Sequence, residues 1–161
     1  MNKKQKRFSV GRRLAIGLIA SFAIFGLLPE EATAAKADLV VVKKKQRKLI
    51  VMKGGKALKT YTISLGANPV GHKQQRGDGR TPEGTYKLDY VNLKSKFYKS
   101  YHISYPNSKD RASAKKRGVN PGGDIFIHGV PNKYTWAGGA LKVIDWTEGC
   151  IAVNNSEMAV S

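Results

Sequence analysis

Cysteine is nearly absent from this 161-residue chain, which has one, Cys150, and only three histidines. A single cysteine rules out an intramolecular disulfide, and the absence of Cys-x-x-Cys and His-x-x-x-His spacing argues against a zinc site. The Gly-x-Ser-x-Gly sequence of serine hydrolases and the Gly-Lys-Ser/Thr ending of a phosphate-binding loop are missing too. We therefore predict that the protein uses no metal and no other cofactor.

Long apolar runs are also scarce. The single long one, Leu14–Leu28, spans about 15 residues, fewer than the ~20 that a membrane helix needs. Six Lys and Arg residues precede this run and Ala32-Thr33-Ala34 follows it, a pattern typical of a secretory signal. We predict a signal peptide over residues 1–34 and export to the periplasm or cell wall, with an uncleaved membrane anchor as the alternative. No cysteine lies near the apolar run, which excludes a bacterial lipoprotein anchor.

Acidic residues are few: 11 Asp and Glu stand against 29 Lys and Arg, a net charge of +18. Residues 1–34 hold six of the basic and two of the acidic residues, so the rest of the chain has a net charge of +14. A charge of this sign attracts polyanions. For an exported protein these are anionic wall polymers, peptide carboxylates and lipid head groups, and we expect no nucleic acid partner. A solubilising surface without a specific partner is the alternative.

Most of the chain after the signal has the pattern of β-strands joined by tight turns. Three of them, 39–42, 49–52 and 57–65, predict an antiparallel meander, with a solvated basic turn at 43–48 and a Gly54-Gly55 hairpin. In the third, Tyr61, Ile63 and Leu65 share one face. Further strands are predicted at 85–91, 97–105, 124–128 and 150–153.

Helices are predicted only at 109–117, capped by Asn107 or Ser108 and stopped by Gly118, and from 155 onward. The Gly- and Pro-rich stretch 66–84 is a loop long enough to indicate a function, and 130–144 is predicted to be irregular. The fold class is therefore mainly β, in one domain with one or two short helices.

The unpaired thiol has two interpretations in an exported protein. Free cysteine is commonly buried and inert, but Cys150 follows Gly149, and His128 ends a predicted strand and is followed by Gly129. A thiol nucleophile needs a base, and His128 is the best placed of the three histidines. His72 lies in a loop, and His102 lies inside a predicted strand. The amides of Gly149 and Cys150 could form an oxyanion hole.

Several motifs together resemble the L,D-transpeptidase (YkuD-type) catalytic domain. His128-Gly129 is followed, after a gap, by Thr147-x-Gly149-Cys150 and an apolar residue. Similar segments occur at Thr81-Pro82-Glu83-Gly84, at 103–107 and at 124–129. The resemblance covers residues 38–158, nearly all of the chain after the predicted signal. We therefore assign residues 35–161 to this domain, and expect it to continue beyond Ser161 because such domains end in a helix and a closing strand.

The resemblance implies a β-sandwich enzyme that acts on peptidoglycan stem peptides, and we expect a monomer that meets the membrane only through the signal or anchor segment. Cys150 would be the nucleophile and His128 its base, with the Gly129 carbonyl orienting the imidazole and the Gly149 and Cys150 amides holding the oxyanion. Thr147, Arg80 and Trp146 would contact the substrate. For Arg80 the alternative is a loop cap, and for Trp146 a core position.

Two positions depart from the common pattern. Glu148 stands where a histidine is usual, and Ala152 stands where an arginine or asparagine is frequent. The Asp-Trp-Thr-x-Gly-Cys form resembles a subgroup with members that cleave wall crosslinks or protein–wall bonds. The sequence therefore leaves open whether the acyl group passes to an amine or to water. A catalytically silent, cationic wall-binding module is a further alternative.

Overall fold

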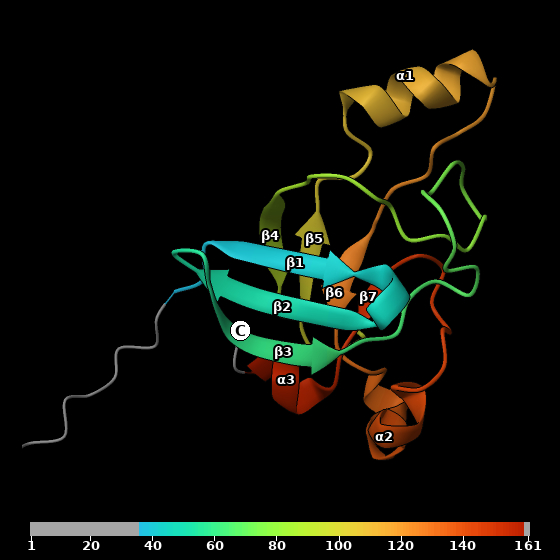
Figure 1. Ribbon diagram of the computed structural model, residues 1–161. Coiled ribbons are helices and arrows are strands. Elements are labelled where there is room, and N and C mark those ends of the chain that lie inside the picture. The colour runs from blue at the N-terminus through green and yellow to red at the C-terminus, as the bar shows by residue number, and fades with distance from the viewer. Residues whose placement is uncertain (1–35, 160–161) are drawn as a thin grey trace, which may run out of the picture. The chain divides into compact units, whose positions relative to one another are not determined.

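The computed structural model describes residues 36–159 of the chain as two β-sheets with three short α-helices (Figure 1). The predicted signal, residues 1–34, lies outside the described residues. None of the described helices has the length and apolar content that crossing a membrane requires. The predicted mainly-β class is confirmed for the described residues.

The first sheet is the antiparallel meander that the sequence predicts. It consists of β1 (Leu39–Lys43), β2 (Lys48–Lys53) and β3 (Lys56–Thr62), and a short 3-10 turn, η1 (Lys44–Gln46), joins β1 to β2. Val42, Leu49 and Tyr61 lie side by side across the three strands and pack against the core. Gly54 and Gly55 connect β2 to β3 with positive φ angles of 54° and 76°, which residues with a side chain resist.

The second sheet contains four strands in the order β4-β5-β6-β7. Its members are β4 (Leu88–Asn92), β5 (Ser100–Ile103), β6 (Phe126–His128) and β7 (Ile151–Ala152). The first three pair antiparallel, and β7 runs parallel to β6. Parallel neighbours need a long crossover, which residues 129–150 provide. The prediction that 130–144 is irregular is wrong, because η2 (Asn132–Ala137) and α2 (Gly138–Leu141) form there.

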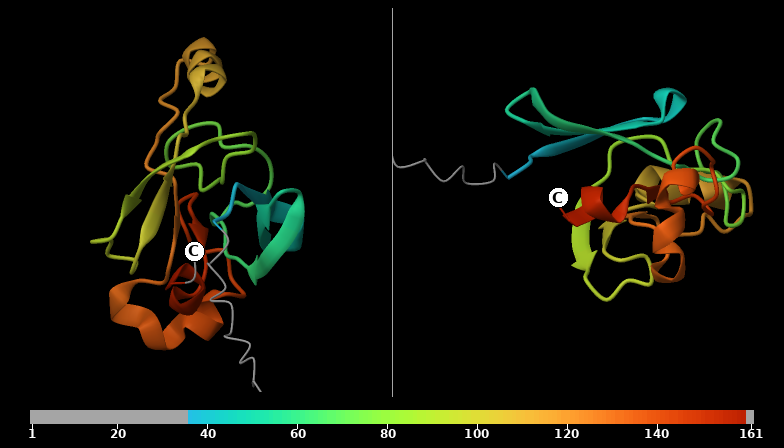
Figure 2. Two further views of the ribbon diagram at one scale, coloured as in Figure 1. Left: turned by 90° about the vertical axis from the view of Figure 1, so that its left-hand side faces the viewer. Right: turned by 90° about the horizontal axis from the view of Figure 1, so that it is seen from below.

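β7 also joins the two sheets, which face each other as layers (Figure 2). Ser64, two residues beyond β3, exchanges two backbone hydrogen bonds with Ala152, each 2.9 Å long. Gly66 forms a second bridge, to Thr147. The segment that leaves β3 therefore runs beside the residues on either side of Cys150.

The predicted strand at 85–91 begins later than expected. β4 starts at Leu88, and Leu88 and Tyr90 are 45% and 50% exposed although their alternation predicts a half-buried face. β4 pairs only with β5 and is an edge strand, so few neighbours cover its side chains.

The predicted helix at 109–117 is present as α1 (Ser108–Lys116). The Asn107 side chain accepts hydrogen bonds from the amides of Lys109 and Asp110, and the Asp110 carboxylate accepts one from the Asn107 amide, which completes a capping box. Gly118 follows with φ +66°. A last helix, α3 (Asn155–Ala159), starts where the sequence predicts.

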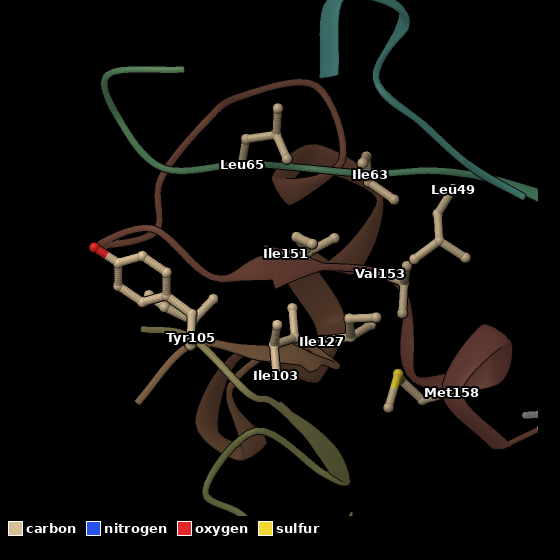
Figure 3. Packing of buried hydrophobic residues seen from close by; sticks show 10 residues of the cluster. Leu49, Ile63, Leu65, Ile103, Tyr105, Ile127, Ile151, Val153 and Met158 are labelled. Atoms are coloured by element: carbon tan, nitrogen blue, oxygen red, sulfur yellow. The ribbon is translucent and has the colours of Figure 1, made fainter. Parts of the chain in front are cut away.

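The core lies between the two sheets (Figure 3). Ile63 and Leu65 are fully buried, which confirms the inward face predicted for that segment. They face the second sheet across Ile151, and α3 contributes Met158. The other buried members are Leu49, Ile103, Tyr105, Ile125, Ile127 and Val153.

The basic turn at 43–48 is not simply solvated, and that prediction is wrong for two of its cations. The Lys44 ammonium donates hydrogen bonds to the carbonyls of Gly71 and Thr81 at 2.6 and 2.8 Å and pairs with Glu83. Arg47 forms a bidentate pair with Asp145. The turn therefore holds both the 66–84 loop and the segment that leads to Cys150.

Ile63 offers a test of the core between the sheets. We expect Ile63→Ala to lower the free energy of unfolding by about 2–5 kcal/mol, because it leaves a cavity that the two sheets cannot fill. Val70 is 77% exposed, so Val70→Ala is the matched control, with a change of about 0.5 kcal/mol or less. Urea unfolding followed by circular dichroism measures both. Equal effects would contradict this account of the core.

Candidate active site

The residues before Cys150 form a tight turn, here called the nucleophile turn (147–150). The Thr147 hydroxyl donates to the Cys150 carbonyl at 2.7 Å and accepts from the Gly149 amide at 3.1 Å. The Thr147 backbone also pairs with Leu65 and Ala67 of the neighbouring segment. Since Thr147 is 5% exposed, its side chain holds the turn together and does not face solvent.

Strand pairing places Cys150 and His128 on one face of the second sheet. Ile127 and Ile151 are directly paired, and both point into the core. Successive side chains of a strand point to opposite faces, so His128 and Cys150, which adjoin these isoleucines, point away from the core on the same side. The parallel pair β6–β7 thus places the two residues that the sequence singled out on the same face of the second sheet.

His128 is 4% exposed and is held in a fixed orientation. Its Nδ1 lies 2.6 Å from the Gly129 carbonyl oxygen, so Nδ1 carries the proton and Nε2 is the nitrogen left to exchange one. The rings of Phe97 and Trp146 pack on the imidazole at centroid distances of 4.5 and 5.7 Å. Burial lowers the pKa of His128, although the bond to Gly129 opposes this.

Cys150 is half-buried, and its Sγ lies 3.7 Å from the Asp124 carbonyl oxygen. Burial raises the pKa of the thiol, while the Phe126 amide and the Lys73 ammonium act to lower it and the Asp124 carboxylate adds to the rise. Together with the lowered pKa of His128, this favours a neutral thiol and a neutral imidazole at neutral pH. No hydrogen bond joins Cys150 to a histidine within residues 36–159, and such bonds often tighten only with substrate bound.

The Gly149 amide, predicted as an oxyanion donor, is already bonded to Thr147 Oγ1. For Gly149 to serve as an oxyanion donor, this bond must break. The Cys150 amide carries no such side-chain bond in the described chain, which makes it the better candidate.

The loop 66–84 packs directly behind the nucleophile turn. A Cβ at Gly149 would lie 2.6 Å from the Arg80 carbonyl oxygen, and a Cβ at Gly66 would lie 2.0 Å from that of Gly79 and 3.0 Å from the Gly149 Cα. Gly149 also has φ +128°, a conformation that other residues rarely adopt. Glycine is therefore required at positions 66 and 149, where the chain after β3, the loop around Arg80 and the nucleophile turn meet.

Arg80 lies beside Gly149, and Trp146 lies beside His128. Arg80 reaches the nucleophile turn through its backbone, and its half-buried guanidinium turns toward Gly71. Trp146 stacks on Phe97 and on the edge of His128. The Nε atom of Arg80 and the indole Nε1 of Trp146 are buried without a hydrogen-bond partner in the described structure. Substrate contact by either side chain stays a prediction, as it does for Thr147.

The other two histidines engage acidic partners away from the thiol. His72 Nε2 lies 3.2 Å from Asp110, and His102 Nδ1 lies 2.6 Å from Asp89. Glu148, two residues before Cys150, is exposed. Among the described residues, no group of three or more His, Cys, Asp or Glu is placed to hold a metal ion.

Sequence reasoning missed two charged pairs that support the site, Arg47–Asp145 and Lys73–Asp78. Asp145 accepts from the Leu65 amide at 2.9 Å as well as from Arg47, so it anchors the residues just before the nucleophile turn. Asp78 precedes a glycine in a loop, a position typical of a side chain that bonds nearby backbone amides. That signal alone could have identified it.

The comparisons with known proteins give a family match and several relatives. A family model described as the YkuD L,D-transpeptidase catalytic domain matches residues 36–160. The Escherichia coli K12 protein named "Putative L,D-transpeptidase YafK" is 33% identical over 100 residues, which cover 61% of this chain and 33% of that protein. The chain thus matches about a third of the length of its curated relatives.

Comparison with solved structures gives a match in fold for Bd1075. Bd1075 of Bdellovibrio bacteriovorus aligns with a TM-score of 0.50 and 24% identity over 75% of this chain and 41% of that chain. The L,D-transpeptidase from Mycobacterium smegmatis aligns with a TM-score of 0.44 and 16% identity over 74% of this chain and 50% of that chain.

The close packing at Gly149 can be tested by one added methyl group. We expect Gly149→Ala to lower the melting temperature and the reactivity of Cys150 toward iodoacetamide, because the new Cβ meets the Arg80 carbonyl and φ is unfavourable. Gly139→Ala is the matched control, since a Cβ there meets nothing within 4 Å. If the two variants behave alike in thermal unfolding and alkylation, the packing account is wrong.

The protonation state of the thiol gives a second test. Burial favours the neutral thiol, so deprotonation of Cys150 needs a higher pH than deprotonation of a free cysteine. We expect the alkylation rate of Cys150 to reach half of its maximum above pH 9.0, the thiol's ordinary pKa. Mass spectrometry of iodoacetamide-treated protein across a pH series measures this. A midpoint below that value would mean that neighbouring charges and hydrogen bonds outweigh the effect of burial on the thiol.

Proposed function

Because the chain belongs to the family of YkuD L,D-transpeptidase catalytic domains, we propose that it is an enzyme that transfers acyl groups between peptidoglycan stem peptides through a cysteine thioester. The observation that carries this proposal is the placement of Cys150 and His128 on one face of the parallel pair β6–β7, with the Gly129 carbonyl fixing the imidazole. The matched relatives are longer than the matched segment, so the activity, substrates and partners of the whole protein are part of the proposal.

In the first step, Cys150 Sγ attacks the carbonyl carbon between the L-configured centre of a diamino acid and a terminal D-residue. His128 Nε2 takes the thiol proton as the carbon–sulfur bond forms, which suits a pair that is neutral at rest. The oxyanion accepts a hydrogen bond from the Cys150 amide. The carbon–nitrogen bond then breaks, and the imidazolium returns its proton to the departing amine of the D-residue.

In the second step, an acceptor attacks the thioester. His128 takes a proton from the attacking amine of another stem, and the released thiolate takes that proton back as the new amide forms. Water in place of the amine gives hydrolysis. The exposed carboxylate of Glu148 lies two residues before Cys150 and attracts cations, which favours an acceptor that arrives as an ammonium group and loses a proton to become the attacking amine.

The neighbours of the two catalytic residues have positioning roles in this proposal. Thr147 closes the nucleophile turn through two hydrogen bonds, and the rings of Phe97 and Trp146 pack on the His128 ring and restrict its movement. Arg80 is the cation assigned to a substrate carboxylate. Neither step draws on a metal or a cofactor.

We propose that the protein is exported and acts at the cell wall. The signal-like residues 1–34 and the net charge of +14 on the remaining chain support export and attraction to anionic wall polymers. We further propose that the enzyme acts as a monomer.

An acylating carbapenem tests the nucleophile. We expect incubation with imipenem to add one drug-derived mass to the wild-type protein, located on Cys150 by peptide mapping. Cys150→Ala should gain none, and His128→Gln should acylate at least about a hundredfold more slowly, the typical contribution of a positioned base. A silent wall-binding module would leave wild type and Cys150→Ala equally unmodified.

Product analysis with purified stem tetrapeptide then separates transfer from hydrolysis. Crosslinked dimer, or exchange of the terminal residue for an added D-amino acid, supports the transferase. Free terminal D-residue with tripeptide alone assigns the protein as a hydrolase on the same site. Cys150→Ala is the control in both assays.

A further inference from the structure

Lys73 is a buried ammonium to which the proposed chemistry assigns no role. It lies in the loop 66–84, is 3% exposed, and its Nζ is 2.8 Å from Asp78 Oδ1. A lysine is rarely buried to this degree, because removal of its charge from water is costly even when the charge is paired. A chain with many exposed lysines gains no solubility from this one, so its position calls for another explanation.

Asp78, the partner of Lys73, is fixed by several hydrogen bonds. The Asp78 carboxylate also accepts hydrogen bonds from the backbone amides of Gln74, Gln75 and Arg80, at 2.6, 3.1 and 3.1 Å. Burial alone would raise the pKa of Asp78, but Lys73 and these amides outweigh it and lower the pKa to about 2. The carboxylate therefore stays ionised, and the ammonium stays in one place.

This pair lies beside the nucleophile turn. The Asp78 carboxylate holds the Arg80 amide, and the Arg80 carbonyl packs on Gly149, the residue before Cys150. The charge of Lys73 acts on the thiol itself and opposes the effect of burial on its pKa. The other charges near the thiol do not replace it, since Asp124 acts in the opposite sense, Glu148 is exposed and acidic, and His128 is neutral at rest.

Lys73 is not available to bind the substrate directly, because Asp78 already engages its ammonium. A cation that receives a stem-peptide carboxylate must face the solvent side of the site, and the Lys73 side chain does not. What remains is the electrostatic field of the ammonium. In a site from which water is largely excluded, a fixed charge of this kind acts more strongly than in solvent.

We propose that the Lys73 ammonium, fixed by Asp78, stabilises the thiolate form of Cys150 and so supports formation of the acyl-enzyme. This inference rests on the proposed role of Cys150 as nucleophile, and it makes Lys73 a positioning residue that acts through charge. The pair offsets part of the cost of ionising a buried thiol without exposing the sulfur to solvent.

The test is the pH profile of Cys150 alkylation by iodoacetamide, which needs no wall substrate. We expect Lys73→Met to shift the profile to higher pH and to slow alkylation at pH 7 by about threefold or more. Lys73→Arg, which keeps the charge, should restore most of the rate. Lys44→Met is the matched control, because Lys44 anchors the same loop through Gly71, Thr81 and Glu83 but is not among the charges that act on the thiol.

The outcomes separate a charge effect from a structural one. A wild-type profile in Lys73→Met, or an equal shift in Lys44→Met, would overturn the proposal. If Lys73→Met does not fold, the double variant Lys73→Met/Asp78→Asn removes both charges and keeps the oxygen that accepts the backbone bonds. A wild-type profile there would overturn it as well. A shifted profile in a protein that forms no acyl-enzyme with imipenem would mean that the proposed function fails while the charge effect stands.

Discussion

Close packing of three backbone segments is the constraint on which the site depends. The segment that leaves β3, the 78–81 part of the long loop and the nucleophile turn meet at Gly66, Gly79 and Gly149, with no room for a side chain at Gly66 or Gly149. Hydrogen bonds between Ser64 and Ala152 draw β7 against the first sheet at the same point. The thiol therefore stands on backbone that is held from both sheets, which suits a nucleophile that must meet a carbonyl carbon in one geometry.

Burial governs the chemistry of that thiol. It raises the pKa of Cys150 and lowers that of His128, so the resting site is neutral. A neutral pair suits the proposed export of the protein, because a thiol resists oxidation better than a thiolate does. Because the resting site is neutral, charge must develop as the proposed reaction proceeds, and this costs free energy. Fixed groups near the sulfur, the Phe126 amide and the Lys73 ammonium, reduce that cost without moving.

Many basic side chains lie on the surface of the described chain. Lys44, Arg47 and Lys73 are instead wholly or partly buried and form ion pairs. Lys44 ties η1 to the long loop, Arg47 ties the same turn to Asp145, and Lys73 pairs with Asp78. Lys44 and Arg47 connect segments far apart in sequence that border the site, and Lys73 pairs within the long loop itself. Long stretches without regular structure, such as 66–84, are thereby held in place by charge-assisted hydrogen bonds where strand pairing is absent.

The sequence alone determined the features that depend on local pattern: the first sheet with its Gly54-Gly55 hairpin, the inward face of Ile63 and Leu65, the capped helix α1, and Cys150 and His128 as the candidate pair. Alternation and glycine placement predict these because they reflect neighbours in the chain. The tertiary structure decided what depends on distant partners. The exposure of Tyr90 follows from β4 being an edge strand. Arg47 pairs with Asp145, 98 residues further along the chain. Lys73 gains its role only when the 66–84 loop packs against the nucleophile turn. A composition count treats that lysine like any other surface cation, because burial and electric field are properties of the folded chain.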